Sequence, residues 1–180
     1  MKVALIGYRG AGKSVVGRRL AEKLGLAFYD TDELVENRSG QTIQEMVAAK
    51  GWDFFRECEK AVIRELSGVD AAVIATGGGA VLDPENRTLL KRNGRVIWLI
   101  ADAQTVMARI RADQGSGMRR PSLTGGDHAD ETGVLLAARA PFYRAAADWS
   151  VQTSGKTVGR IVDELCSGLD GFENSQPPLP

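Results

Sequence analysis

Residues that commonly bind transition metals are scarce in this sequence. It has two cysteines, Cys58 and Cys166, which lie far apart, and one histidine, His128. Neither their number nor their spacing fits a zinc site. We therefore expect no structural metal, and we expect both thiols to be reduced, as is usual in the cytoplasm.

An excess of charge and a long apolar run are also absent. The 23 basic and 23 acidic residues give a formal net charge of zero, so no overall field attracts nucleic acid or an anionic membrane. No apolar stretch could span a bilayer, and the one near the N-terminus is too short for a secretory signal. The sequence predicts a cytoplasmic protein without nucleic-acid or membrane partners.

The most informative feature that is present is a glycine-rich motif. Residues 7–14 read GYRGAGKS, which fits the pattern G-x-x-x-x-G-K-S. The motif follows an apolar run at 3–6 and precedes residues 15–24, whose apolar positions recur at helical spacing. A strand, a glycine loop and a helix in this order are the expected context of a phosphate-binding loop, or P-loop.

The chemistry of such a loop depends on its backbone and on two side chains. Successive N–H groups and the positive end of the helix face an anion. Lys13 can reach the β- and γ-phosphates of a nucleotide, and the hydroxyl of Ser14 can bind Mg²⁺. The alternative is a glycine turn without a ligand. The predicted ATP-binding residues here are Gly10, Ala11, Gly12, Lys13, Ser14 and Val15.

Strand and helix patterns alternate along the chain, which predicts an α/β fold with a parallel sheet. At this length we expect one domain, covering residues 1–170. The predicted strands are 3–6, 26–29, 71–75, 96–100 and 149–151. The later helical patterns lie near 32–38, 42–49, 52–67, 84–92, 103–111, 128–146 and 157–168.

Two segments do not fit this alternation of strand and helix patterns. Residues 112–127 are rich in glycine and contain Arg120-Pro121, which is typical of a mobile lid over a site or of a plain surface loop. Residues 171–180 end in QPPLP and are predicted to be a disordered tail.

Two carboxylates follow the second predicted strand. Asp30 and Asp32 lie two residues apart, so they share one side of an extended chain. Ligands in open α/β sheets bind outside the carboxyl ends of the strands. With the P-loop, these carboxylates could hold Mg²⁺ and a hydroxyl acceptor. The alternative role for each is to cap the next helix.

Two arginines are candidates for binding a carboxylate. Arg56 lies beside aromatic residues on a predicted helix, with Glu59 three residues later to hold it in place, and Arg139 lies on a later helix. A guanidinium binds a carboxylate through two parallel hydrogen bonds. A solvated position, with an exposed ion pair for Arg56, is the alternative in each case.

Residues near two loops complete the candidate site. Gly77, Gly78 and Gly79 follow the third predicted strand and would bring bare backbone close to a ligand, unless they form an ordinary turn. Arg120 could approach the phosphoryl group as the lid closes and stabilise its charge, unless it is a surface residue.

Taken in order, these motifs make the sequence resemble the shikimate kinase family, from about residue 2 to residue 169. The motifs are GYRGAGKS at 7–14, DTD at 30–32, FFRECE at 54–59, TGGGAV at 76–81, RRPSL at 119–123 and RAPFYRAAAD at 139–148. A P-loop alone indicates only a large superfamily, whereas the ordered set is far more specific.

The resemblance implies a fold and a reaction. The fold is a P-loop NTPase-type three-layer α/β fold, similar to nucleoside monophosphate kinases. Its five-stranded parallel sheet has the order 2-3-1-4-5, with a substrate-binding helical region near 32–62 and a lid near 112–127. The enzyme would be a monomer that transfers the γ-phosphoryl group of ATP to the 3-hydroxyl of shikimate, with Mg²⁺.

Roles for individual residues follow from the same resemblance. Asp32 would hold the shikimate hydroxyls and take the proton, and Asp30 would order the water shell of Mg²⁺. Arg56 and Arg139 would bind the shikimate carboxylate. The same resemblance puts residues 77–79 in the acceptor pocket, Arg120 against the phosphates, and Lys156 in the adenine-side loop. The catalytic residues implied are Lys13, Asp32 and Arg120.

Three positions depart from the family pattern. Trp52 stands where an acidic residue is usual, Val47 where an aromatic residue is frequent, and Ser122 where a leucine is usual. None removes a group assigned to the chemistry. Two rival functions stay open, namely another small-metabolite kinase, such as a gluconate or nucleoside monophosphate kinase, and a nucleotide-binding module without catalysis.

Overall fold

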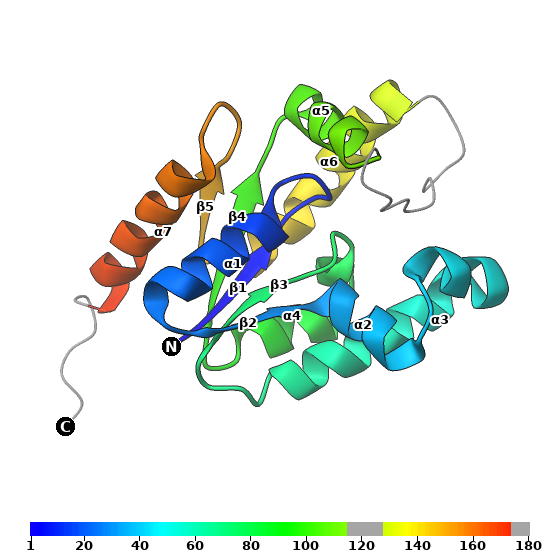
Figure 1. Cartoon of the computed structure of the whole chain (residues 1–180), viewed down its shortest axis with the longest axis horizontal. Coiled ribbons are helices and arrows are strands. Elements are labelled where there is room, and N and C mark those ends of the chain that lie inside the picture. Colours follow the sequence, from blue (N-terminus) through cyan, green and yellow to red (C-terminus); the bar gives the residue numbers. More distant parts are fainter. Residues whose placement is uncertain (115–127, 174–180) are drawn as a thin grey trace.

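One parallel sheet of five strands forms the centre of the molecule (Figure 1). The computed structural model describes residues 1–114 and 128–173; the helical residues 113, 114, 128–131, 172 and 173 are described by their backbone alone. The strand order is β2-β3-β1-β4-β5, which confirms the order implied by the resemblance. The strands are β1 (Lys2–Ile6), β2 (Ala27–Asp30), β3 (Ala72–Ala75), β4 (Arg95–Ile100) and β5 (Trp149–Gln152).

Every residue of β1 is buried because helices cover both faces of the sheet. Val3 and Leu5 point into one core, together with Leu20 and Leu165, whereas Ala4 and Ile6 point into the other. This alternation explains why a central strand reads as a continuous apolar run. The three-layer α/β architecture predicted from the sequence is thus confirmed.

The helices lie in the order that the sequence patterns predicted. They are α1 (Lys13–Leu24), α2 (Thr31–Ser39), α3 (Ile43–Leu66), α4 (Pro84–Lys91), α5 (Ala103–Gln114), α6 (His128–Ala146) and α7 (Val158–Glu173), with a 3₁₀ turn at Ala80–Leu82. Helices α1 and α7 pack on one face of the sheet, and α3, α4 and α6 contribute to the core on the other. None of the helices in the described ranges is both long and apolar enough for a membrane span.

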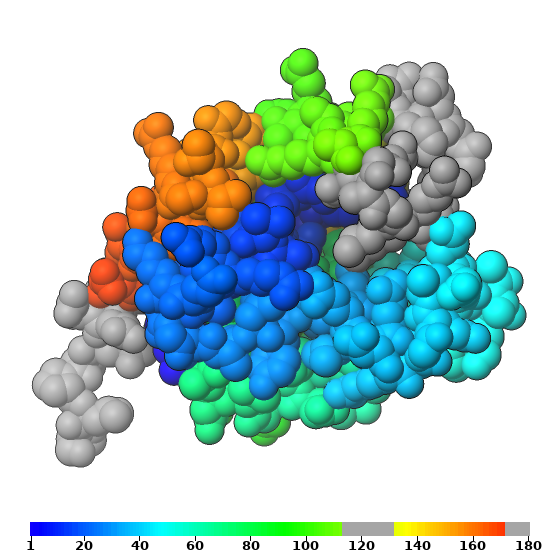
Figure 2. Space-filling view, in the orientation of Figure 1, coloured from blue at the N-terminus to red at the C-terminus, as the bar shows by residue number. Residues whose placement is uncertain are grey.

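Helix α2 and the first part of α3 extend beyond the carboxyl edge of the sheet (Figure 1). They have a small core of their own, in which Val35, Met46 and Phe55 pack with Ile74 of β3. Arg18 of α1 forms an ion pair with Glu33 of α2, and Figure 2 shows the two helices adjoining on one face. This helical region occupies the residues predicted to bind the substrate.

Glycines end or interrupt the helices of this region. The sequence predicted separate helices at 42–49 and 52–67, and the structure joins them in α3 with a break at Gly51, where φ is 81°. A positive φ is costly for other residues but accessible to glycine. The break turns the segment that carries Trp52 and Arg56 toward the sheet edge.

Two predicted helix ends are wrong, by three residues for α5 and by five residues for α7. Helix α5 extends to Gln114, so residues 112–114 are helical and not part of a loop. They are acceptable helix formers, and the first glycine follows at 115. Helix α7 extends to Glu173, into the predicted tail, because the packing of Leu165 and Leu169 on the core supports its last turns. Residues 115–127, with the rest of the predicted lid, and 174–180 lie outside the described residues.

A substitution of Gly7 tests whether close packing against β4 positions the start of the P-loop. Its φ is 143°, and a Cβ placed there would lie 2.5 Å from the carbonyl oxygen of Leu99 in β4. We expect Gly7→Ala to lower the free energy of unfolding by about 2 kcal/mol through backbone strain and this overlap.

Gly159 is the matched control. It lies in α7 with open space around its Cβ position, so Gly159→Ala should stabilise the protein by up to about 1 kcal/mol. Urea unfolding of both variants measures the two values. Equal effects of the two substitutions would contradict the role given to Gly7.

Candidate functional site

The residues that follow β1, β2 and β3 meet at the carboxyl edge of the sheet. The N–H of Gly77 donates to Thr31 Oγ1 at 2.9 Å, which joins the segment after β3 to the segment after β2. The N–H of Thr76 donates to the carbonyl oxygen of Leu5 in β1 at 3.1 Å. The sheet thus brings together the P-loop, the DTD motif and the glycine loop 77–79, which are far apart in the sequence.

The P-loop leads directly into the first turn of α1. Gly12 is the N-cap of this helix, with φ of 95°, and Lys13 is its first residue. The Nζ of Lys13 donates to the carbonyl oxygen of Tyr8 at 2.9 Å, so its side chain folds back over the loop. The ammonium group and the N-terminal end of α1 therefore face the same space, as binding of a phosphate requires.

Asp30 caps α2, which is one of the two roles that the sequence left open, and it also contacts the P-loop. Its Oδ1 accepts the N–H groups of Asp32 and Glu33, which makes it the N-cap of α2. Its Oδ2 accepts the hydroxyl of Ser14 at 2.6 Å. One carboxylate thus caps α2 and reaches the P-loop.

The pair of Ser14 and Asp30 fits a magnesium ion chemically. A hydroxyl and a carboxylate are hard oxygen ligands, and Mg²⁺ usually keeps several of its waters beside such groups. No cluster of three or more carboxylate, thiol or imidazole groups that could hold a metal exists among the described residues. These two residues would therefore share Mg²⁺ with water and with nucleotide phosphates.

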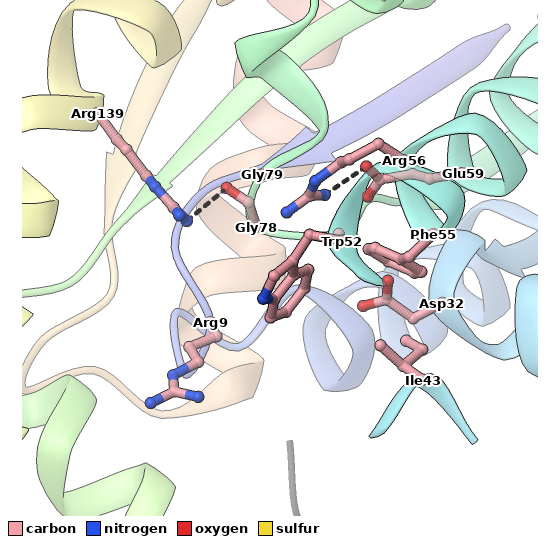
Figure 3. A pocket seen from close by; sticks show the side chains of 11 residues that line it. Arg9, Asp32, Ile43, Trp52, Phe55, Arg56, Glu59, Gly78, Gly79 and Arg139 are labelled. Atoms are coloured by element: carbon pink, nitrogen blue, oxygen red, sulfur yellow. Dashed lines mark hydrogen bonds and ion pairs between the residues drawn. The ribbon is translucent and has the colours of Figure 1, made fainter. Parts of the chain in front are cut away.

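A pocket opens beside the P-loop and encloses about 440 Å³, its open mouth included (Figure 3). One wall is apolar and consists of Ile43, Trp52 and Phe55. The remaining residues are charged or glycine: Arg9, Asp32, Arg56, Glu59, Gly77, Gly78, Gly79 and Arg139. The predicted acceptor residues therefore lie together.

Arg56 is held from several sides. Its Nη1 donates to Glu59 Oε2 at 2.5 Å, and Glu59 is fully buried. The guanidinium carbon also lies 5.6 Å from the ring centre of Trp52 and 5.0 Å from that of Phe55. The predicted support of Arg56 by Glu59 is confirmed, and Trp52, which departs from the family pattern, forms part of the pocket wall. An arginine fixed in this way loses little freedom when it binds a carboxylate.

The glycine loop 77–79 has no room for side chains. A Cβ at Gly77 would overlap the carboxylate of Glu59, and one at Gly79 would overlap the guanidinium of Arg56. A Cβ at Gly78 would lie 3.1 Å from the backbone nitrogen of Arg9. The sequence predicted that these glycines bring the backbone close to a ligand. The structure adds that they make space for the site's own charged groups.

Tyr143 and Arg139 of α6 approach the glycine loop from the other side. The hydroxyl of Tyr143 donates to the carbonyl oxygen of Gly78 at 2.5 Å, and Arg139 Nη1 lies 3.5 Å from the same oxygen. The Tyr143 ring stacks on Trp98 of β4, with centres 5.5 Å apart. Burial raises the pKa of Tyr143 to about 12. The tyrosine is thus a neutral hydrogen-bond donor at physiological pH.

The sequence analysis missed Arg109, which ties the P-loop to a distant segment. Its Nη1 donates to the carbonyl oxygen of Gly10 at 3.1 Å and its Nη2 to that of Thr153 at 3.2 Å. The Thr153 hydroxyl lies 3.3 Å from the carbonyl oxygen of Ala11. No motif marks Arg109 in the sequence, because its partners come from segments about 44 and 99 residues away.

Of three other residues predicted to bind ATP, the structure places two, and the third lies outside the described residues. Val15 lies in the first turn of α1 with 61% of its surface exposed. Lys156 lies in the loop before α7, and its Nζ pairs with Glu164 at 2.5 Å. Arg120, the predicted lid arginine, lies outside the described residues.

Comparison with known proteins identifies the family. The family model for shikimate kinase matches residues 9–170. The chain belongs to the shikimate kinase family. It is 45% identical to a shikimate kinase of Syntrophus aciditrophicus over 171 residues, which is 91% of this chain and 88% of the relative. It is also 45% identical to a shikimate kinase of Symbiobacterium thermophilum over 170 residues, covering 94% and 96% of the two chains.

Solved shikimate kinase structures share the fold. A shikimate kinase from Acinetobacter baumannii in complex with shikimate is 32% identical and has a TM-score of 0.88, covering 98% of this chain and 95% of the other. The enzyme from Aquifex aeolicus is 30% identical with a TM-score of 0.81, covering 98% and 100%. The resemblance drawn from the ordered motifs is thereby confirmed, as is the P-loop kinase fold that it implied.

Tyr143→Phe tests the support of the glycine loop. The substitution keeps the ring on Trp98 but removes the donor to Gly78, so we expect the free energy of unfolding at neutral pH to fall by about 1 kcal/mol. Because folding raises the tyrosine pKa from 10 to about 12, its stabilising effect is complete below pH 10 and is lost between pH 10 and 12. Urea unfolding from pH 7 to 12 should show the wild-type advantage shrinking in that range.

Tyr29→Phe is the control for this variant. Tyr29 is half-buried in β2 and packs against a different apolar cluster from the one that contains Tyr143 and Trp98. A Tyr143→Phe variant as stable as wild type at pH 7 would contradict the role given to the hydroxyl.

Proposed function

We propose that this chain, as a shikimate kinase, transfers the γ-phosphoryl group of ATP to the 3-hydroxyl of shikimate. The assignment of the site depends on one observation. The P-loop and the pocket that contains Arg56, Arg139 and Asp32 lie at the same edge of the sheet. Shikimate is a small polyhydroxylated carboxylate. Its recognition needs cations for the carboxylate and an acceptor for the hydroxyls, and this pocket supplies both.

In our proposal the nucleotide lies on the P-loop. The N–H groups of residues 10–15 surround its phosphates, and Lys13 leaves Tyr8 to bind the β- and γ-phosphates. Ser14 and Asp30 would hold Mg²⁺, Asp30 through water. When bound, the ion neutralises charge on the phosphates. Two further residues are proposed to contact ATP: Arg120 and Lys156.

The acceptor would lie with its carboxylate toward Arg56 and Arg139. Both guanidinium groups lie beside the glycine loop (Figure 3). The backbone of residues 77–79 lines the same end, and the N–H groups of Gly78 and Gly79 would add donors for the acceptor's oxygen atoms. The ring of shikimate then rests on the apolar wall of Trp52 and Phe55. This orientation leaves its hydroxyls for Asp32.

Asp32 is the residue that we propose acts on the reacting hydroxyl. It is 6% exposed, and its Oδ1 lies 2.9 Å from the Cβ position of Gly77. The hydroxyl oxygen attacks the γ-phosphorus, the bond from phosphorus to the ADP oxygen breaks, and Asp32 receives the hydroxyl proton. Because the transition state of phosphoryl transfer is loose, positioning by Asp32 contributes more than early removal of the proton.

The remaining proposals concern the protein as a whole. We propose one kinase domain over residues 1–170, with a lid near 115–127 that excludes water from the site. We further propose a monomer in the cytoplasm. Reduced Cys58 and Cys166, which are not bonded to each other, are consistent with that compartment.

Release of ADP tests the proposed reaction. Purified protein is incubated with ATP and Mg²⁺, alone and with shikimate, gluconate or a nucleoside monophosphate. We expect strong stimulation by shikimate alone, and none in the Lys13→Ala variant. Stimulation by a different acceptor would overturn the acceptor assignments. Binding of ATP without turnover with any acceptor would favour a nucleotide-binding module.

Asp32→Asn tests the acceptor-activating residue. The amide keeps the shape of the side chain but cannot accept a proton, so we expect kcat to fall by about 10² to 10⁴, with KM for ATP little changed. Asp53→Asn is the matched control, because Asp53 is exposed on α3. Steady-state kinetics of both variants measure the effect. Near-wild-type turnover of Asp32→Asn would remove Asp32 from the mechanism.

A further inference from the structure

The pocket contains a third arginine, Arg9, which has no role in the reaction proposed above. Arg9 occupies a variable position of the P-loop pattern, where any residue fits the motif. It nevertheless lines the acceptor pocket, together with Arg56, Arg139 and Asp32. Arg9 is therefore the P-loop residue that is found in the lining of this pocket.

Unlike Arg56, which is paired with Glu59, Arg9 has a side-chain nitrogen without a hydrogen-bond partner in the described structure. Its Nε is buried and has no hydrogen-bond partner among the described residues. A buried donor without an acceptor is costly, at roughly 1–3 kcal/mol. By contrast, Arg56 donates to Glu59, and Arg139 lies near the Gly78 carbonyl oxygen. Arg9 thus has donors available for a ligand.

The backbone places Arg9 at the boundary between the two substrates. The peptide before it carries the Tyr8 carbonyl oxygen, which accepts the Nζ of Lys13 at 2.9 Å. On the other side, the Arg9 nitrogen lies 3.1 Å from the Cβ position of Gly78 in the glycine loop. An arginine side chain that starts here can reach the place where a γ-phosphoryl group meets an acceptor.

The side chain of Arg9 points in a different direction from those of Arg56 and Arg139. Figure 3 shows the guanidinium groups of Arg56 and Arg139 turned toward the glycine loop, whereas that of Arg9 is turned away from it. An acceptor carboxylate bound by Arg56 and Arg139 would leave Arg9 for a second anionic group.

The charges of the pocket lead to the same assignment. Three arginines face two carboxylates, Asp32 and Glu59, and Glu59 is paired with Arg56. With Glu59 against Arg56 and the acceptor carboxylate against Arg139, the charged groups that remain are Arg9 and Asp32. A phosphoryl group then adds about two negative charges at neutral pH. The cation that stands apart from the carboxylate end is Arg9.

We propose that Arg9 binds the phosphoryl group during its transfer and in the phosphorylated product. Its guanidinium donates to the equatorial oxygens of the γ-phosphoryl group, and these contacts strengthen as the group moves from ADP to the acceptor. Arg9 thereby stabilises charge on the transferring group, in addition to Lys13. The inference rests on the proposed reaction, and it assigns to this P-loop a contact with the product as well as with ATP.

The test uses three variants of the full chain. Arg9→Met removes the charge at similar length, and Arg9→Lys keeps the charge but not the paired donors. Arg19→Met is the control, because Arg19 is an exposed residue of α1 paired with Glu22. Thermal unfolding confirms that each variant is folded. Steady-state kinetics and calorimetric titration with shikimate and shikimate 3-phosphate, in the presence of ADP, are then compared.

We expect Arg9→Met to lower kcat and the affinity for shikimate 3-phosphate by about tenfold or more, the effect of losing a charge-assisted hydrogen bond. The affinity for shikimate should stay within about twofold. Arg9→Lys should recover part of both losses, and Arg19→Met should match wild type. The product titration needs no turnover and separates Arg9 from a general loss of activity.

Two results would overturn the inference. Unchanged kcat and unchanged product affinity in Arg9→Met would show that Arg9 does not contact the phosphoryl group. A parallel loss of affinity for shikimate and for its phosphate would place Arg9 on the carboxylate instead. If the wild-type protein itself released no ADP with shikimate, the proposed reaction would fail, whatever the variants did.

Discussion

The site depends on one packing constraint, the close approach of the glycine loop 77–79 to the groups around it. Glu59 and Arg56 occupy the space where side chains of Gly77 and Gly79 would be, and the backbone of Arg9 adjoins Gly78. Any Cβ in this loop would push the acceptor pocket away from the P-loop. Phosphoryl transfer depends on the alignment of two substrates, and this contact holds the pocket beside the P-loop.

Around this contact, the buried carboxylates of Glu59 and Asp30 are paired or hydrogen-bonded. Glu59 is fully buried and holds Arg56, and Asp30 accepts both the N–H groups of α2 and the hydroxyl of Ser14. A buried charge without such partners would be costly and would disorder the site. The same pairs also position groups that would meet the substrates. Stability and positioning thus rest on the same contacts.

The sequence predicted the repeated strands and helices because β1, β3 and β4 are apolar runs and the helices between them have a clear period. It also predicted that Asp32, Arg56, Arg139 and residues 77–79 would lie near one another, since each belongs to a motif with a known chemical role. It placed the end of α5 three residues early and that of α7 five residues early, because composition does not show how far tertiary packing supports a last helical turn. Arg109 was missed, because only the folded chain brings it to Gly10 and Thr153.

By itself the sequence determined the fold class, the family and the kinds of group that the site contains. Those properties depend on local patterns and on the order of motifs, both of which are written along the chain. The tertiary structure decided which groups meet: Tyr143 with Gly78, Asp30 with Ser14, and Arg9 with the acceptor pocket. These contacts join residues on separate strands and helices, so their geometry comes from the twist and packing of the sheet.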